Sequence, residues 1–340
     1  MKLPEGRTRI ISGSDLFDSL PDEIVIFILC KLAATASSPL DFVTVLLTCK
    51  RLNTLGVNRL VLSNAGPETL AVSAKNWCDE AHRFLKLCIH AGNKEALYIL
   101  GMILFYCLQN RGSGASLMAK AGIKLHTPAL YSLALIQFNG SGGMKNDKDL
   151  PAGVALCERA AFLGHVDALR ELGHCLQDGY GVPKKVEEGR YLIRQANVRE
   201  LASILCTFDA TPFSSVSPPS IACEFHSDQQ RPDLTDSYER ESPCPPISSL
   251  RLLNRYWSNV PKERSHPANR FLVEWFNLRS GGIPGPGLRM CSNERCGRPE
   301  TRKNEFRKCS GCGKVNYCSR GCQAYDWRLH HKVECAPIDD

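Results

Sequence analysis

Apolar residues recur at helical spacing near the N-terminus, where Leu20-Pro21-Asp22-Glu23 introduces them. Proline fits the first helical position because its missing N–H would be unpaired there, and acidic side chains favour the positive end of a helix. One apolar face then comprises Ile24, Val25, Ile28 and Leu29. A second helix is predicted from Asp41, with a buried side made of Val43, Leu46, Leu47 and Leu52. The pattern indicates a pair of amphipathic helices.

Residues 65–207 repeat one pattern three times. A Leu directly follows each of Ala96, Ala129 and Ala168. A second Leu lies four residues after each alanine and is itself followed by Gly or Ala. A glycine-rich turn and a second helix that ends in small residues follow in every unit. Such repetition predicts stacked helix pairs. The pattern resembles the Sel-type relatives of tetratricopeptide repeats, which implies an α/α solenoid with an open concave face for a protein partner.

The segment 208–282 differs in composition from the repeats. Prolines and serines dominate residues 208–249, which are predicted to be disordered because they bury too little apolar surface to offset the entropy of ordering. Apolar residues then return at helical spacing and predict a helix near 268–279, packed on the repeats or on the segment that follows. These residues are Phe271, Leu272, Trp275, Phe276 and Leu278.

Seven of the 17 cysteines fall in the last fifty residues, together with the pair His330-His331. The cysteines are Cys291, Cys296, Cys309, Cys312, Cys318, Cys322 and Cys335. Eight ligands are enough for two tetrahedral zinc sites. The polar N-terminal segment 1–14 lacks the apolar region of a signal peptide, so we expect a nuclear or cytoplasmic location with reduced thiols. Metal binding is therefore favoured over disulfides.

The spacing of these ligands also indicates local structure. Cys309 and Cys312 flank a glycine turn, and Cys318 and Cys322 are four residues apart, on one face of a short helix. His331 is likewise four residues before the last cysteine. His330 is five residues before it, in a poorer helical register, so the spacing favours His331 and leaves His330 as the alternative.

The run Tyr317-Cys318, Cys322-Gln323, Trp327, followed by His and Cys, resembles a MYND-type zinc finger, assigned to residues 283–340. The resemblance implies interleaved ligands: Cys291, Cys296, Cys318 and Cys322 for one ion, and Cys309, Cys312, His331 and Cys335 for the other. Two spacings depart from the family pattern. Cys291 and Cys296 have four residues between them where the family usually has two, and the interval from Cys322 to His331 is one residue longer than is common in the family. A RING finger also interleaves two zincs, but this chain lacks its two final Cys-x2-Cys pairs. Related fingers dock short proline-containing motifs.

The N-terminal helices, with Leu20-Pro21 at their start and Cys49-Lys50-Arg51-Leu52-Asn53 at their end, resemble the F-box, assigned to residues 16–64. That family binds the Skp-type adaptor of cullin-RING ubiquitin ligases. The resemblance implies an adaptor-binding face of Leu20, Pro21, Ile24, Val25 and Ile28. The alternative is an ordinary helical hairpin that caps the next domain.

Composition narrows the classes of partner. The chain is 43% hydrophobic and 23% charged, with a net charge of +7, as in folded globular proteins. This net charge is mild, and the charges of residues 289–340, eleven Lys or Arg against seven Asp or Glu, are evenly mixed, so we expect no nucleic-acid partner. Apolar runs are too short to span a membrane. His174 and Cys175 are adjacent on a helix, so they point in different directions and do not form a nucleophile and its base.

The order of F-box, Sel-type repeats and MYND finger resembles a small group of plant F-box proteins. It implies a mainly α protein with a flexible N-terminus (1–15), which binds adaptor and cullin complex and holds an unknown target through its repeats or finger. The chain would then be the non-catalytic substrate-recognition subunit of an SCF-type ubiquitin ligase. The alternative is a MYND and repeat scaffold of transcriptional or chromatin regulation. MYND fingers also occur in lysine methyltransferases, but no segment here resembles a methyltransferase domain.

Overall fold

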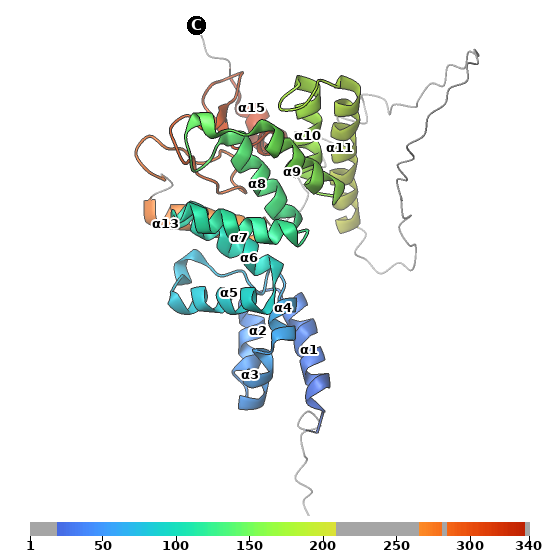
Figure 1. Ribbon diagram of the computed structural model, residues 1–340, viewed down its shortest axis with the longest axis vertical. Helices are drawn as coiled ribbons and strands as arrows, with labels where there is room; N and C mark the ends of the chain where they lie inside the picture. The colour runs from blue at the N-terminus through green and yellow to red at the C-terminus, as the bar shows by residue number, and fades with distance from the viewer. Residues whose placement is uncertain (1–18, 209–264, 281–283, 337–340) are drawn as a thin grey trace, which may run out of the picture. The chain divides into compact units, whose positions relative to one another are not determined.

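The computed structural model describes residues 19–208, 265–280 and 284–336, which are mainly helical, as predicted (Figure 1). The predicted flexible N-terminus (1–15) and the predicted disordered stretch (208–249), apart from the end of one helix, lie outside these residues. No helix among them is both long and apolar enough to cross a membrane. The helices before the gap are α1 (Asp22–Thr35), α2 (Pro39–Leu46), α3 (Lys50–Gly56), α4 (Arg59–Asn64), η1 (Ala74–Asn76), α5 (Asp79–Ala91), α6 (Lys94–Met102), η2 (Ile103–Cys107), α7 (Arg111–Ile123), α8 (Thr127–Asn139), η3 (Lys145–Asp147), α9 (Leu150–Phe162), α10 (Val166–Asp178) and α11 (Val186–Phe208).

Helix α1 buries Val25, Leu29 and Ala33 in the hydrophobic core. The predicted second helix is in fact two helices, α2 and α3. Ser38 begins α2 through a capping box with Asp41, and the Cys49 sulfur accepts the Leu52 N–H to begin α3. In this register Phe42 is fully buried, whereas Val43 and Leu47 are exposed. The prediction that Val43 and Leu47 are buried was wrong, because these caps set a different helical phase.

The sequence repeat corresponds to a repeated helix start. Side chains at the N-caps of α6, α8 and α10 accept a hydrogen bond from the backbone N–H of Ala96, Ala129 and Ala168 respectively. All three alanines are fully buried. Successive helices from α6 to α10 pack side by side (Figure 1). We call α6, α8 and α10 the first helices of their units.

Glycines set the close approach of the two helices within a unit. A Cβ atom on Gly114 of α7 would lie 2.7 Å from the Gly101 carbonyl oxygen of α6. In the third unit, a Cβ on Gly189 would lie 2.5 Å from the Gly173 carbonyl oxygen. Cβ contacts this short do not occur without displacement of backbone. The small residues of the repeat are therefore required where paired helices cross.

Helix α13 (Pro267–Ser280) covers the segment for which a helix is predicted near 268–279, and it packs on η1, α6 and η2. Phe271, Leu272 and Trp275 are buried in the same core as the repeats. The Glu274 carboxylate accepts hydrogen bonds from the Ser73 hydroxyl (2.6 Å) and the Ala74 N–H (2.8 Å). The helix therefore joins residues about 200 positions apart to one core.

The C-terminal part contains β1 (Arg307–Lys308) and β2 (Asn316–Tyr317), which pair antiparallel, and then α14 (Arg320–Asp326), η4 (Trp327–His331) and α15 (Lys332–Glu334). Its cysteines belong to a second buried cluster together with residues of α8, α9 and α10. With α13 on α6 and α14 on α10, residues of the same chain cover a side of the first helices. The sequence analysis predicted that the array leaves a concave face open, whereas α13 and α14 cover part of the first helices.

Candidate metal centres

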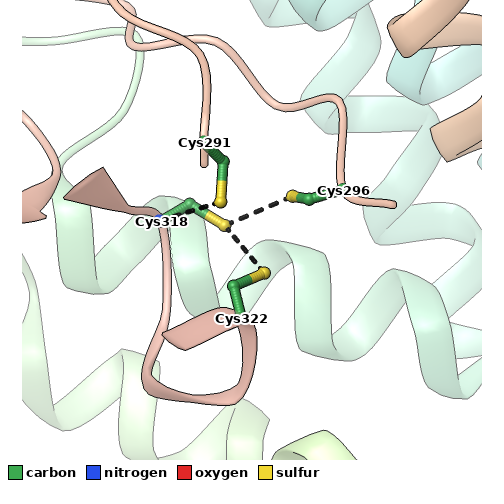
Figure 2. Close-up of side chains that lie close together, drawn as sticks. All are labelled: Cys291, Cys296, Cys318 and Cys322. Carbon is green, nitrogen blue, oxygen red and sulfur yellow. Dashed lines mark hydrogen bonds between the residues drawn. The ribbon is translucent and has the colours of Figure 1, made fainter. Parts of the chain in front are cut away.

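The first predicted ligand set gathers around one point. Cys291 and Cys296 come from one loop, Cys318 directly follows β2, and Cys322 lies in the first turn of α14. Their sulfurs converge (Figure 2), all within 4.8 Å of one another, with 3.5 Å from Cys296 to Cys318 and 3.6 Å from Cys318 to Cys322. A tetrahedral zinc with Zn–S bonds of about 2.3 Å places its sulfurs roughly 3.8 Å apart. The set therefore fits one zinc ion.

The second predicted set, Cys309, Cys312, His331 and Cys335, also has its donor atoms within 4.8 Å of one another. The Cys309 and Cys335 sulfurs are 3.9 Å apart, and the Cys312 sulfur is 3.5 Å from His331 Nε2. Three thiolates and one imidazole are a common donor set for structural zinc. The chain thus has two interleaved zinc clusters, one with four cysteine ligands and one with three cysteines and a histidine.

The two neighbouring histidines have different surroundings. His331 is 3% exposed and its Nε2 faces Cys312, whereas the side chain of His330 is 43% exposed, with Nδ1 3.4 Å from Asp326 Oδ1. The extra residue between Cys322 and His331 falls where η4 forms a π-helical turn. A π turn accommodates one inserted residue in a helix. The longer spacing is therefore compatible with four converging ligands.

The wider first pair, Cys291 and Cys296, is also accommodated locally. Asn293 accepts the Arg295 N–H with its side chain (3.1 Å), and its carbonyl accepts the Cys296 N–H (2.9 Å). This turn folds the four intervening residues back on themselves. Both departures from the family spacing are therefore absorbed by local backbone structure.

Secondary structure fixes the remaining ligands. Ser319 caps α14 by accepting the Cys322 N–H (3.0 Å), which orients the first turn of that helix. Gly313 takes a positive φ of 62° in the turn between the strands and donates to the Cys309 carbonyl (2.9 Å). In each set the protein supplies all four donors, as in structural zinc sites, where the ion stabilises the fold.

A third group of metal-ligand residue types is formed by Glu95, His126 and His266. We call it the clamp, because His126 is hydrogen-bonded to Glu95 and His266 is paired with the same carboxylate. His126 Nε2 lies 2.9 Å and His266 Nε2 2.7 Å from the two carboxylate oxygens of Glu95. Each Nδ1 atom accepts a backbone N–H, from Ala129 (3.3 Å) and Ala268 (3.1 Å). The proton of each neutral imidazole is therefore assigned to Nε2, where a metal would need a lone pair.

This clamp joins α6, α8 and α13. Burial opposes ionisation of Glu95, but the contacts of its carboxylate with His126 and His266 lower the pKa of the carboxyl to about 2. The sequence analysis missed the clamp. The available signal was the alignment of His126 with the other two N-cap residues, Asn93 and His165.

Burial shifts the pKa values of the adjacent residues His174 and Cys175. Burial raises the pKa of the Cys175 thiol to about 12 and lowers the pKa of His174 to about 4. The thiol therefore stays protonated near neutral pH, whereas a cysteine nucleophile reacts as the thiolate.

The predicted adaptor-binding residues occupy two environments. Pro21, Ile24 and Ile28 are exposed and Leu20 is half-buried, but Val25 is fully buried in the core. Other exposed apolar residues, which the sequence analysis did not select, are Phe27, Leu40, Val43 and Leu47. Arg51 of α3 holds the start of α1, because its guanidinium donates to Asp22 Oδ1 (2.7 Å) and to the Leu20 carbonyl.

Comparison with known proteins gives matches over the repeats, the finger and nearly the full chain. Residues 68–150 match the family described as plant tetratrico peptide repeats, and residues 291–335 match the MYND finger. The chain is 59% identical to F-box protein At1g67340 of Arabidopsis thaliana over 339 residues, 99% of this chain and 83% of that protein. It is also 59% identical to F-box protein At5g50450 of the same plant, over 95% of this chain and 86% of that protein. A Sel1 repeat protein from Oxalobacter formigenes aligns over 38% of this chain and 96% of its own, with a TM-score of 0.33 and 19% identity.

Proposed function

The chain belongs to the family of these two Arabidopsis F-box proteins, and on that basis we propose that it is the substrate-recognition subunit of an SCF-type ubiquitin ligase. In this proposal the F-box helices bind the Skp-type adaptor, which links the chain to the cullin complex. The repeats and the MYND finger, both elements of protein interaction, hold the target.

One observation carries the proposal: α1 is apolar on two faces. The first face, with Val25 and Leu29, is in the core. The second contains Ile24 and Phe27, which remain 47% and 60% exposed, and also Ile28. Exposed apolar side chains gathered on one helix are typical of a docking surface. Among the described residues this face has no cover, which suits binding to the apolar groove of another protein.

The proposed mechanism is positional. Binding of a target on one part of the chain and of the adaptor on another raises the effective concentration of a target lysine near a ubiquitin-loaded enzyme. The residues of this chain would bind and orient, and the covalent chemistry would take place elsewhere in the ligase.

The experiment that tests the proposal is a binding assay between full-length protein and a Skp-type adaptor. We expect Ile24→Ala/Ile28→Ala to weaken binding by at least about tenfold, and Leu20→Ala/Pro21→Ala to do the same. Ile123→Ala removes an exposed apolar side chain of the same type from α7, 74% exposed against 47% for Ile24, and is the control. Zinc content and thermal unfolding should match the wild type in the control and in Ile24→Ala/Ile28→Ala. Adaptor binding by the Ile24/Ile28 variant at the wild-type level would contradict the proposal.

A second candidate function, a scaffold in transcriptional or chromatin regulation, is favoured by one groove. It has a volume of about 270 Å³ and is lined by His174, Arg320, Gln323, Ala324 and Trp327. A partly exposed tryptophan suits proline-containing peptides, whose extended helix docks on aromatic side chains. Peptide binding without any adaptor binding would support this candidate over the ligase subunit.

For either function we propose that the protein acts in the nucleus, the cytoplasm or both. Imaging of a fluorescent fusion would test this, since accumulation in a secretory compartment would contradict it.

A further inference from the structure

Among the described residues, Arg298, Arg302 and Arg320 of the finger donate side-chain hydrogen bonds to the repeats, and the first of them is buried. Arg298 Nη2 donates to the Ser132 hydroxyl of α8 (2.8 Å), and its Nη1 donates to the Cys296 sulfur (3.4 Å). Its side chain therefore connects a ligand of the first zinc site directly to a first helix. A guanidinium in a buried position requires compensating negative charge or hydrogen bonds.

The second arginine completes the end of α8. Arg302 donates to the carbonyl oxygens of Asn139 (2.5 Å) and Gly140 (2.9 Å), which have no partner within the helix. In return the Asn139 amide donates to the carbonyl of Cys318, another ligand of the first site (2.9 Å). The C-terminal end of α8 is thus capped by the finger.

The third arginine pairs with acids of α10. The Arg320 N–H donates to Glu171 Oε2 (2.9 Å), and its guanidinium contacts Asp178. Glu171 is buried, and burial raises the pKa of its carboxyl while Arg320 opposes that rise. A Cβ on the next residue, Gly321, would lie only 3.1 Å from the Tyr131 hydroxyl of α8, so the finger approaches the first helices closely.

The two zinc sites differ in this respect. The contacts above involve Cys296 and Cys318 directly, or Arg320, which lies between Cys318 and Cys322. The hydrogen bonds found for Cys309, Cys312, His331 and Cys335 within the described residues stay inside the finger. Within the described residues, ligands of the first site, but not of the second, therefore take part in the hydrogen bonds that join the finger to the repeats.

We propose that the finger is an intramolecular ligand of the first helices α8 and α10, and that occupancy of the first zinc site controls its docking through Arg298. We define the docking face as Ser132, Asn139, Glu171 and Asp178. Four thiolates outweigh the charge of one zinc ion, so the loaded site is anionic and stabilises the buried guanidinium. Without the ion nothing holds the loop of Cys296 and the turn of Cys318 together, because a structural metal site is folded by its ion. Arg298 and Asn139 then lose partners that are fixed in position. The finger then leaves the docking face, which becomes available to another protein.

Hydrogen–deuterium exchange of the full-length protein tests this, read separately in α8, α10 and residues 309–335. Cys296→Ser removes a ligand of the first site, Cys312→Ser is its match in the second, and Arg298→Met keeps all eight ligands. We expect Cys296→Ser and Arg298→Met to speed exchange in α8 and α10 by at least about tenfold. Cys312→Ser should speed exchange only in residues 309–335. Zinc content should fall from two to one in each serine variant and stay at two in Arg298→Met.

Two results would overturn the inference. One is equal deprotection of α8 and α10 by both serine variants, because docking would then depend on the finger as a whole. The other is Arg298→Met with two zincs and unchanged exchange. If Arg298→Met does not fold, Ser132→Ala removes the partner hydroxyl on α8, together with its contact to the Tyr98 hydroxyl of α6 (3.1 Å), and is judged by the same criteria. None of these outcomes depends on adaptor binding, so the experiment tests this inference independently of the proposed function.

Discussion

His330 and His331 are neighbours in the chain, but only His331 is buried beside a cysteine sulfur. We therefore expect His331→Ala to lower the zinc content from two ions per chain to one, because the second site is left with three ligands. His330→Ala is the matched control and should keep both ions. Zinc quantified by atomic emission on the purified variants checks this, and a loss of zinc confined to the His330 variant would reverse the assignment.

Glu95 connects protein stability to pH. The folded-state pKa of its carboxyl is about 2, against an ordinary value of 4.5, so its ionised form is favoured by folding. The difference corresponds to roughly 3 kcal/mol at neutral pH. This stability is complete above about pH 4.5 and is lost as the pH falls toward 2. We expect Glu95→Gln to lower the free energy of unfolding at pH 7 by up to that amount.

The measurement is chemical unfolding of wild type and Glu95→Gln at several pH values. The difference between them should shrink as the pH falls from 4.5 to 2, because the wild-type carboxyl becomes protonated there. Glu188→Gln, which removes only an exposed ion pair with Lys185, is the control. A difference that stays constant across this range would show that Glu95 does not stabilise the clamp as a charge.

At the scale of residues, the zinc ligands could be predicted from the sequence, whereas contacts between side chains far apart in the chain could not. Clustered cysteines indicate zinc because the coordination geometry of the ion is the same in every protein, and the resemblance to the MYND finger implies how the ligands divide between two ions. The Glu95 clamp could not be predicted in this way, since His266 reaches Glu95 only after α13 has folded back on α6. Val25 was assigned to the adaptor face because helical spacing does not tell which of two apolar faces is in the core.

At the scale of elements, the crossing of α6 and α7 makes Gly114 sensitive to any side chain. We expect Gly114→Ala to lower the free energy of unfolding by about 1–3 kcal/mol, because its Cβ would meet backbone of α6 and η2. Gly112 lies in the same helix, and a methyl group added there would have nothing within 4 Å, so Gly112→Ala should be neutral or stabilising. Thermal unfolding of the pair distinguishes a crossing effect from a general effect of alanine on α7.

Helix α1 offers a similar comparison between its two apolar faces. Val25→Ala should destabilise the protein by about 2 kcal/mol, because it leaves a cavity in the core. Ile24→Ala on the exposed face should leave thermal unfolding nearly unchanged. Adaptor binding should show the opposite order, with the larger loss for Ile24→Ala. If Ile24→Ala destabilised the fold as much as Val25→Ala, the exposed face would have a structural role instead.

The predicted repeat phase is accurate because each unit marks its own start, with an N-cap side chain three residues before a buried alanine. The sequence predicted one second helix in the F-box region and missed its division into α2 and α3. Its break at Cys49 depends on a sulfur acting as a cap, which no common N-cap rule includes.

At the scale of the whole molecule, the least predictable feature is that the chain covers its own repeats. A solenoid pattern indicates a free face, and nothing in residues 65–207 shows what that face binds. The cover depends on pairs such as Arg298 with Ser132 and Arg320 with Glu171, which are separated by about 150 residues or more. Such pairs leave no periodic signal in the sequence.

The position of that cover at the far end of the chain has a consequence during synthesis. Helix α10 ends at Asp178, and the last zinc ligand is Cys335, so roughly 150 residues separate the docking face from the end of its cover; at about 5–20 residues per second, they take on the order of ten seconds to translate. During that interval the nascent repeats expose the docking face, with the Glu171 carboxylate and the Asn139 carbonyl still without their partners from the finger. A ribosome-bound chain stalled before Cys291 would therefore depend on chaperones that hold the unfinished repeats until the finger is made.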